Sequence, residues 1–138
     1  YKCNLQTDTE VITYIIDFLL RVKKLTLEEV AKVISASFWS TINDKSEEEK
    51  RQEIFLRKAF PSLLINGPFS IIFGFEGGMM ALNDRLKLRS MVCAEKGDLA
   101  SVSSEECGIR VIEPELDKIF APAGGQPVIY TLREGVDR

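Results

Sequence analysis

The spacing of apolar residues changes once along this chain, at Asn66-Gly67-Pro68, and this change constrains the fold more than any other feature. Before it, apolar side chains recur at intervals of three and four residues, the period of an amphipathic helix. After it, short β-prone runs alternate with glycine-containing turns, which is typical of antiparallel hairpins. Helices followed by meandering strands favour an α+β fold with an antiparallel sheet. Because no repeat or linker interrupts the 138 residues, we expect a single domain over residues 1–138.

Three helices are predicted in the first half of the chain. The first starts at Thr7, where Thr-Asp-Thr-Glu matches the Ser/Thr-x-x-Glu capping box, and its apolar face includes Val11, Ile15, Phe18 and Leu19. The second, residues 26–37, starts with a similar capping sequence. The third, about 46–60, has an acidic first turn, which the positive end of the helix dipole favours. Pro61 is expected to end it, because proline breaks the helical hydrogen-bond pattern.

The second half is predicted to consist mainly of strands. A hairpin pairs residues 69–75 with 79–82, and another pairs 90–95 with 99–103 around Lys96-Gly97-Asp98. A short helical turn is expected over about 113–120, because Pro114 suits the first position of a helix. A last strand is expected over 128–132.

The composition excludes several kinds of chemistry within this chain. It has no histidine, which rules out Ser-His-Asp and Cys-His catalysis and removes the commonest zinc ligand. Its three cysteines are odd in number and widely spaced, which fits neither a disulfide framework nor a metal knuckle. We therefore expect no metal site, and a reducing cytoplasm is the simplest compartment.

Charge and hydropathy point away from nucleic acid and membranes as partners. The net charge is -3, so no basic surface is indicated. The longest apolar stretch is too short to span a bilayer and is interrupted by polar residues. We also expect no secretory signal sequence.

Four segments, read in order, resemble the class II (N-terminal-nucleophile) glutamine amidotransferases, and most of all the glutaminase domain of glutamate-synthase-type proteins. Residues 6–12 resemble the family's Ser/Thr-Asp-Thr-Glu helix start, and residues 64–72 resemble its Gly-Pro/Ala-Phe/Trp-Ser/Ala strand. Residues 84–91 resemble its Asp-x-x-Gly-x-Arg-Pro-Leu/Met segment, with Lys87 in place of glycine and Ser90 in place of proline. Residues 103–105 correspond to the Ala-Ser-Glu that ends the next strand.

This resemblance implies both a fold and a reaction. The fold is an αββα sandwich, in which helices cover two antiparallel sheets. In the reaction, a cysteine at the mature N-terminus attacks the side-chain amide of L-glutamine with its own α-amino group as base, and ammonia and then glutamate are released. An Asn-Gly pair supplies the oxyanion hole. The route requires no cofactor, and the ammonia serves a synthase domain or subunit, as in glutamate biosynthesis.

The resemblance also divides the site between this chain and an upstream segment. The family's nucleophile, its carboxylate-binding arginine and its oxyanion-hole pair all precede the Thr-Asp-Thr-Glu helix, so no catalytic residue is expected here. Asp8 is expected to bind the α-ammonium group of glutamine, with Thr7 beside it. A carboxylate in the first turn of a capped helix is also favoured by the dipole alone, and the two roles are compatible. Cys3 is not expected to be the nucleophile, because that residue must stand at position one.

Two other hypotheses remain open at this point. The chain could be a non-catalytic amidotransferase-like module that serves binding or assembly, or a small unrelated α+β interaction domain. A fold without room for a second antiparallel layer would favour the unrelated domain. If strands pair with an absent half of the domain, their exposed edges predict self-association of this chain.

Overall fold

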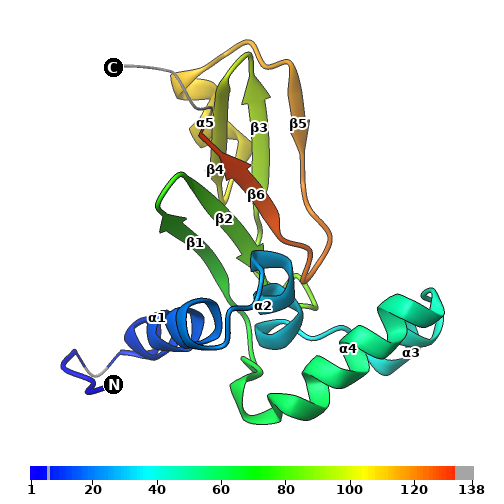
Figure 1. Cartoon of the computed structure of the whole chain (residues 1–138). Coiled ribbons are helices and arrows are strands. Elements are labelled where there is room, and N and C mark those ends of the chain that lie inside the picture. Colours follow the sequence, from blue (N-terminus) through cyan, green and yellow to red (C-terminus); the bar gives the residue numbers. More distant parts are fainter. Residues whose placement is uncertain (6, 133–138) are drawn as a thin grey trace. The chain divides into compact units, whose positions relative to one another are not determined.

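A computed structural model of the chain describes residues 1–5 and 7–132 (Figure 1). It consists of two compact units, the first ending at Ile65 and the second starting at Asn66. The boundary coincides with the change of apolar period at Asn66-Gly67-Pro68. The expected single domain over residues 1–138 stays a prediction, and each unit is described below by itself.

The first unit is helical, and all three helices expected from the sequence are present. The first is followed by one turn of π-helix, and a short helix between the second and third was not expected. The helices are α1 (Asp8–Asp17), the π-turn (Phe18–Val22), α2 (Leu27–Ile34), α3 (Trp39–Asn43), α4 (Glu47–Ala59) and a 3₁₀ turn (Pro61–Leu63).

Local capping sets the starts of these helices. Thr26 and Ser46 each form a complete capping box with the glutamate three residues later. Thr7 caps α1 through its side chain, which accepts a hydrogen bond from the Glu10 N–H. Pro61 begins the 3₁₀ turn directly after α4, so the expected end of this helix is confirmed.

Apolar side chains from several helices of the first unit are buried. Helix α2 packs against α4, and α3 also contacts α4. Lys32 and Glu29 of α2 both hydrogen-bond the Gln52 side chain of α4, at 2.8 and 3.0 Å. The buried apolar residues of the unit are Ile16, Leu19, Val30, Ala31, Val33, Ile34, Ala36, Ile42 and Leu56.

The second unit contains two three-stranded antiparallel sheets. In the first sheet, β2 lies between β1 and β6 and pairs with both. In the second sheet, β3 lies between β4 and β5. The hairpins expected from the sequence are therefore confirmed. The strands are β1 (Ser70–Phe75), β2 (Gly78–Asn83), β3 (Val92–Lys96), β4 (Leu99–Ser103), β5 (Lys118–Phe120) and β6 (Val128–Thr131).

The two sheets of this unit face each other across a shared apolar core. Its centre is formed by Ala81, Met91 and Cys93, with Val102, Phe120 and Val128 packed around them. These residues come from both sheets and from the segment between them, so neither sheet buries this face alone. Burial raises the pKa of the Cys93 thiol, as befits a cysteine that acts as a core residue. A second antiparallel layer is thus present.

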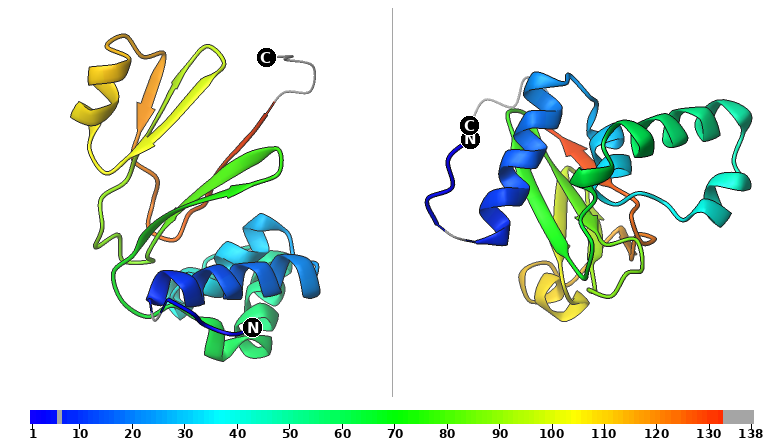
Figure 2. Two further views of the ribbon diagram at one scale, coloured as in Figure 1. Left: turned by 90° about the vertical axis from the view of Figure 1, so that its left-hand side faces the viewer. Right: turned by 90° about the horizontal axis from the view of Figure 1, so that it is seen from below.

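Helix α5 (Glu106–Ile112) covers the outer side of the second sheet, opposite the first sheet (Figure 2, left). Ile109 is its buried residue, at 3% exposure, whereas Val111 and Ile112 are more than 80% exposed. The second unit is therefore layered as helix, sheet and sheet. Together the two units give an α+β chain with two small antiparallel sheets, in agreement with the expected class.

The helical turn predicted over residues 113–120 is wrong. The helix lies earlier, and it ends before Glu113, whose backbone is extended (φ −133°, ψ 95°). Glu113 precedes Pro114, and a residue before proline is sterically driven out of the helical region. Residues 118–120 form β5 instead, where Phe120 pairs with Cys93 of β3. Pairing between distant segments outweighs the local helix signal here.

Every helix in the described part of the chain is too short or too polar to cross a lipid bilayer.

Candidate functional site

Thr7 and Asp8, the residues expected to bind substrate, lie at the start of α1. Thr7 has an extended backbone (φ −116°, ψ 149°), and its hydroxyl accepts the Glu10 N–H at 3.2 Å. This bond satisfies one of the free N–H groups at the helix end. Thr7 therefore caps the first turn of α1 through the Glu10 N–H.

The Asp8 side chain is exposed and carries only local contacts. Its Oδ1 accepts the Thr9 N–H at 2.8 Å and the Thr9 hydroxyl at 3.5 Å. Within the described residues, Oδ2 has no hydrogen-bond partner and the carboxylate forms no ion pair. A negative charge at this end is stabilised by the helix dipole, and one oxygen is available to an ammonium group.

Residues 1–5 are held against α1 by its own side chains. The Glu10 carboxylate accepts the N–H groups of Asn4 and Leu5 at 2.8 and 2.7 Å, and the Tyr14 hydroxyl donates to the Lys2 carbonyl at 3.2 Å. The Tyr1 hydroxyl bonds Asp17 at 2.5 Å. Residues 1–5 are therefore ordered by hydrogen bonds to the helix that Asp8 begins. Cys3, on this segment, is exposed.

The third motif, residues 84–91, is organised by Asp84, which is buried at 3% exposure. Its carboxylate accepts N–H groups of the turn that follows, from Leu86 at 3.0 Å, Leu88 at 3.1 Å and Arg89 at 3.3 Å. It also accepts the Phe69 N–H, at 3.4 Å. Burial raises the pKa of this carboxyl, but the four backbone donors together outweigh burial and lower the pKa below its usual value.

Two further features define the backbone of this turn. Lys87 adopts a positive φ of 54°, a left-handed conformation that glycine tolerates better than other residues. Gly124 approaches the turn so closely that a Cβ atom there would lie 2.6 Å from the Arg85 carbonyl oxygen. The turn is therefore constrained both from within, by Asp84, and by the neighbouring loop.

The second motif, residues 64–72, crosses from the last residues of the first unit into β1, and the fourth lies at the end of β4. Phe69, just before β1, is buried, and its carbonyl accepts the Asp84 N–H at 2.9 Å, which links the second motif to the third. The fourth motif starts at Ser103, the last residue of β4, and leads into α5. The Ser103 hydroxyl accepts the Glu105 N–H at 3.3 Å, an arrangement that turns the chain from strand to helix.

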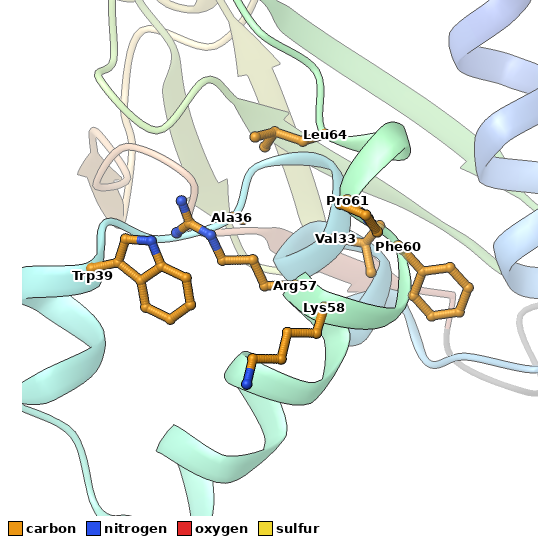
Figure 3. Close-up of a pocket in the computed structure, with 8 residues that line it drawn as sticks. All are labelled: Val33, Ala36, Trp39, Arg57, Lys58, Phe60, Pro61 and Leu64. Atoms are coloured by element: carbon orange, nitrogen blue, oxygen red, sulfur yellow. The ribbon is translucent and has the colours of Figure 1, made fainter.

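A pocket in the first unit was not expected from the sequence (Figure 3). Its volume is about 340 Å³, and its walls come from α2, α3, the end of α4 and the turn that follows α4. The lining side chains are mostly apolar, with two cations among them. They are Val33, Ala36, Trp39, Arg57, Lys58, Phe60, Pro61 and Leu64.

Arg57 is the most constrained polar side chain of this pocket. Its guanidinium lies over the Trp39 indole, 4.3 Å from the ring centroid, and its Nη1 donates to the Ser37 carbonyl. Figure 3 shows the side chain extending from α4 toward Trp39. In the sequence, the only signals of this pocket are the aromatic pair Phe38-Trp39 and the basic pair Arg57-Lys58. They lie too far apart in the chain for their proximity to follow from spacing.

Among the described residues, no group of three or more cysteine, aspartate or glutamate side chains is arranged to hold a metal ion. No known family model matches the chain, and no solved structure matches it either. The chain is 43% identical, over 133 residues or 96% of its length, to an uncharacterized protein of Archaeoglobus fulgidus. It spans 35% of the length of that relative, so the similarity covers one part of a longer archaeal protein.

Proposed function

We propose that this chain is the glutamine-binding part of a class II glutamine amidotransferase domain of the glutamate-synthase type. Its site would hydrolyse L-glutamine to glutamate and ammonia for a synthase domain or subunit in the cytoplasm. The observation that carries the proposal is the position of the four motifs, each of which lies at the end of a helix or strand. Sites built at element ends use side chains that a rigid scaffold orients.

The two antiparallel sheets of the second unit support this assignment. They face each other through a common core, and α5 covers the outer side of one of them. An Ntn-hydrolase sandwich has this order of layers, helix on sheet on sheet, and adds further helices on the remaining face. The second antiparallel layer argues against a small unrelated α+β interaction domain.

The backbone of the third motif supports the assignment independently. Lys87 stands where the family has glycine. Its φ of 54° lies in the left-handed region, which glycine adopts more readily than other residues. The sequence departs from the motif at this position, while the backbone keeps the geometry that the motif implies. Asp84, the first residue of the motif, closes the turn with its carboxylate.

In the proposed site, Asp8 binds the α-ammonium group of glutamine through a charge-assisted hydrogen bond. Thr7 positions it by capping the helix. The reaction itself belongs to the upstream segment, whose N-terminal cysteine attacks the amide carbon while its α-amino group takes the thiol proton. Ammonia leaves, and water then hydrolyses the thioester to glutamate. No catalytic residue is assigned to this chain.

The proposal is tested first by assaying ammonia release. This chain alone should release no ammonia from glutamine, whereas the longer protein that contains it should. In the longer protein, Asp8→Asn should raise the KM for glutamine by roughly tenfold or more, because a charged partner of the ammonium is lost. Asp44→Asn, at an exposed position after α3, is the matched control and should keep the KM of the wild type.

A substrate analogue makes this test specific to the ammonium group. Glutaramate has the side-chain amide and the carboxylate of glutamine but no α-amino group. The Asp8→Asn variant and the wild type should bind glutaramate equally well, so that their difference is confined to glutamine. An equal loss for both compounds would assign Asp8 a purely structural role.

Exposed apolar residues favour the second candidate function, a non-catalytic amidotransferase-like module for binding or assembly. Val111 and Ile112 of α5 are 83% and 81% exposed. Apolar side chains with so large an exposed fraction favour burial against a partner molecule. A longer protein that releases no ammonia from glutamine, and whose mature N-terminus is not cysteine, would favour this candidate over the first.

A further inference from the structure

We propose that the pocket of the first unit binds a small organic carboxylate with an apolar body. This proposal rests on residues of the first unit alone and does not depend on the glutaminase assignment. The pocket volume, about 340 Å³, lies within the range of known small-molecule sites. The pocket is also built from elements that pack against one another, since α3 and α2 both contact α4.

The charges of the lining residues indicate whether the pocket favours a positively or a negatively charged ligand. Both ionisable residues of the lining, Arg57 and Lys58, are cationic, and no carboxylate lines the pocket. In the described part of the chain, neither residue forms an ion pair. The pocket therefore has positive charge that its own walls do not neutralise, and an anion would supply the missing partner.

The contacts of Arg57 indicate which anion fits. Nη1 is bound to the Ser37 carbonyl and the guanidinium plane lies over Trp39, so the group is held in one orientation before a ligand arrives. Nε and Nη2 have no hydrogen-bond partner among the described residues. These two N–H groups form the edge that pairs with both oxygens of a carboxylate at once.

The apolar walls indicate the rest of the ligand. Phe60, Pro61 and Leu64 contribute partly or fully exposed side chains that a bare inorganic anion would leave uncovered. An aromatic or branched aliphatic body would remove this surface from water, and the indole of Trp39 offers a flat face for it. The ligand class is therefore a monocarboxylate with an apolar ring or chain, rather than phosphate or a nucleotide.

The single tryptophan of the chain gives a direct test, because its fluorescence reports from the pocket wall. The probe is 4-phenylbutyrate, compared with the uncharged 4-phenylbutanol and with inorganic phosphate. We expect a saturable change of Trp39 fluorescence with the carboxylate, at least about tenfold weaker binding of the alcohol, and no saturable change with phosphate. These comparisons use the wild-type chain and require no variant to fold.

Variants then assign the binding to the lining residues. Arg57→Lys keeps the charge but loses the planar fork, and should weaken phenylbutyrate binding by about tenfold. Lys58→Gln should weaken it by roughly threefold. Arg51→Gln is the matched control, because Arg51 is an exposed residue of the same helix outside the pocket lining, and it should bind like the wild type.

Three results would overturn the proposal. The first is the absence of a saturable fluorescence change with phenylbutyrate. The second is equal binding of the carboxylate and the alcohol by the wild type. The third is equal binding of phenylbutyrate by the wild type and Arg57→Lys.

Discussion

Two aspartates, one in each unit, belong to two of the motifs and have opposite environments. Asp8 is exposed at the start of α1, and among the described residues its hydrogen bonds are confined to Thr9, the next residue. Asp84 is buried after β2, and its carboxylate binds four backbone N–H groups. A carboxylate whose bonding capacity is used by the backbone holds the fold together, whereas one left exposed can bind a ligand. The residue type alone does not distinguish them.

Asp84→Ala should produce the largest loss of stability. It leaves four backbone N–H groups without their charged acceptor, and we expect the free energy of unfolding to fall by about 3 kcal/mol. Asp8→Ala, compared by urea unfolding under the same conditions, should cause a much smaller loss, because only an exposed local contact is removed. Equal losses for the two variants would contradict the division between a structural and a ligand-binding aspartate.

Acidification should weaken the Asp84 turn selectively. Because the pKa of this carboxyl is lowered by folding, the unfolded chain binds its proton more readily. The stability it contributes is therefore fully present above the unfolded pKa of about 3.9 and is lost as the pH falls through the folded pKa. Urea midpoints measured from pH 6 to pH 2 should fall less steeply for Asp84→Asn than for the wild type. Parallel curves would contradict this linkage.

Gly124→Ala tests the contact that constrains the same turn from outside. The added Cβ would lie 2.6 Å from the Arg85 carbonyl oxygen, so backbone must move, and we expect a loss of about 1–3 kcal/mol in urea unfolding. Gly74→Ala in β1 is the control, since a Cβ there meets no atom within 4 Å. If both substitutions are equally tolerated, the loop does not hold the turn.

Lys87→Gly should have the smallest effect and the opposite sign. Replacing a lysine at φ 54° with glycine relieves left-handed strain, and we expect a gain of about 0.5–1 kcal/mol in thermal or urea unfolding. Lys24, with φ 58° in the first unit, should respond in the same way. Lys23→Gly is the control, because its φ of −86° is ordinary and glycine there should destabilise. A destabilised Lys87→Gly variant would remove the strain argument.

Short-range patterns predicted the helix starts and the hairpins. Thr26 and Ser46 cap their helices through the glutamate three residues later, so the whole interaction lies within one turn of sequence. The turn at Gly77 similarly joins two strands that are neighbours in the chain. These elements could be predicted because the groups that stabilise them are already close in the unfolded chain.

The candidate sites were predicted less completely, for the same reason. Thr7 and Asp8 lie at a helix start as expected, but that Asp8 is exposed while Asp84 is buried depends on packing. The pocket lined by Trp39 and Arg57 joins two helices whose contact no local pattern specifies. The helix predicted over residues 113–120 was wrong, because pairing of residues 118–120 with β3 overrode the local helix signal.

The sequence by itself therefore determined where the chain changes from helix to strand, at Asn66-Gly67-Pro68, and which residues cap the helices. Backbone sterics and hydrogen bonds within four residues are sufficient for both. Only the tertiary structure decided that β6 joins β2, that β5 joins β3 and that Gly124 meets the Asp84 turn. These contacts join residues far apart in the chain, so they form only when the burial of a shared core outweighs the entropy of closing long loops.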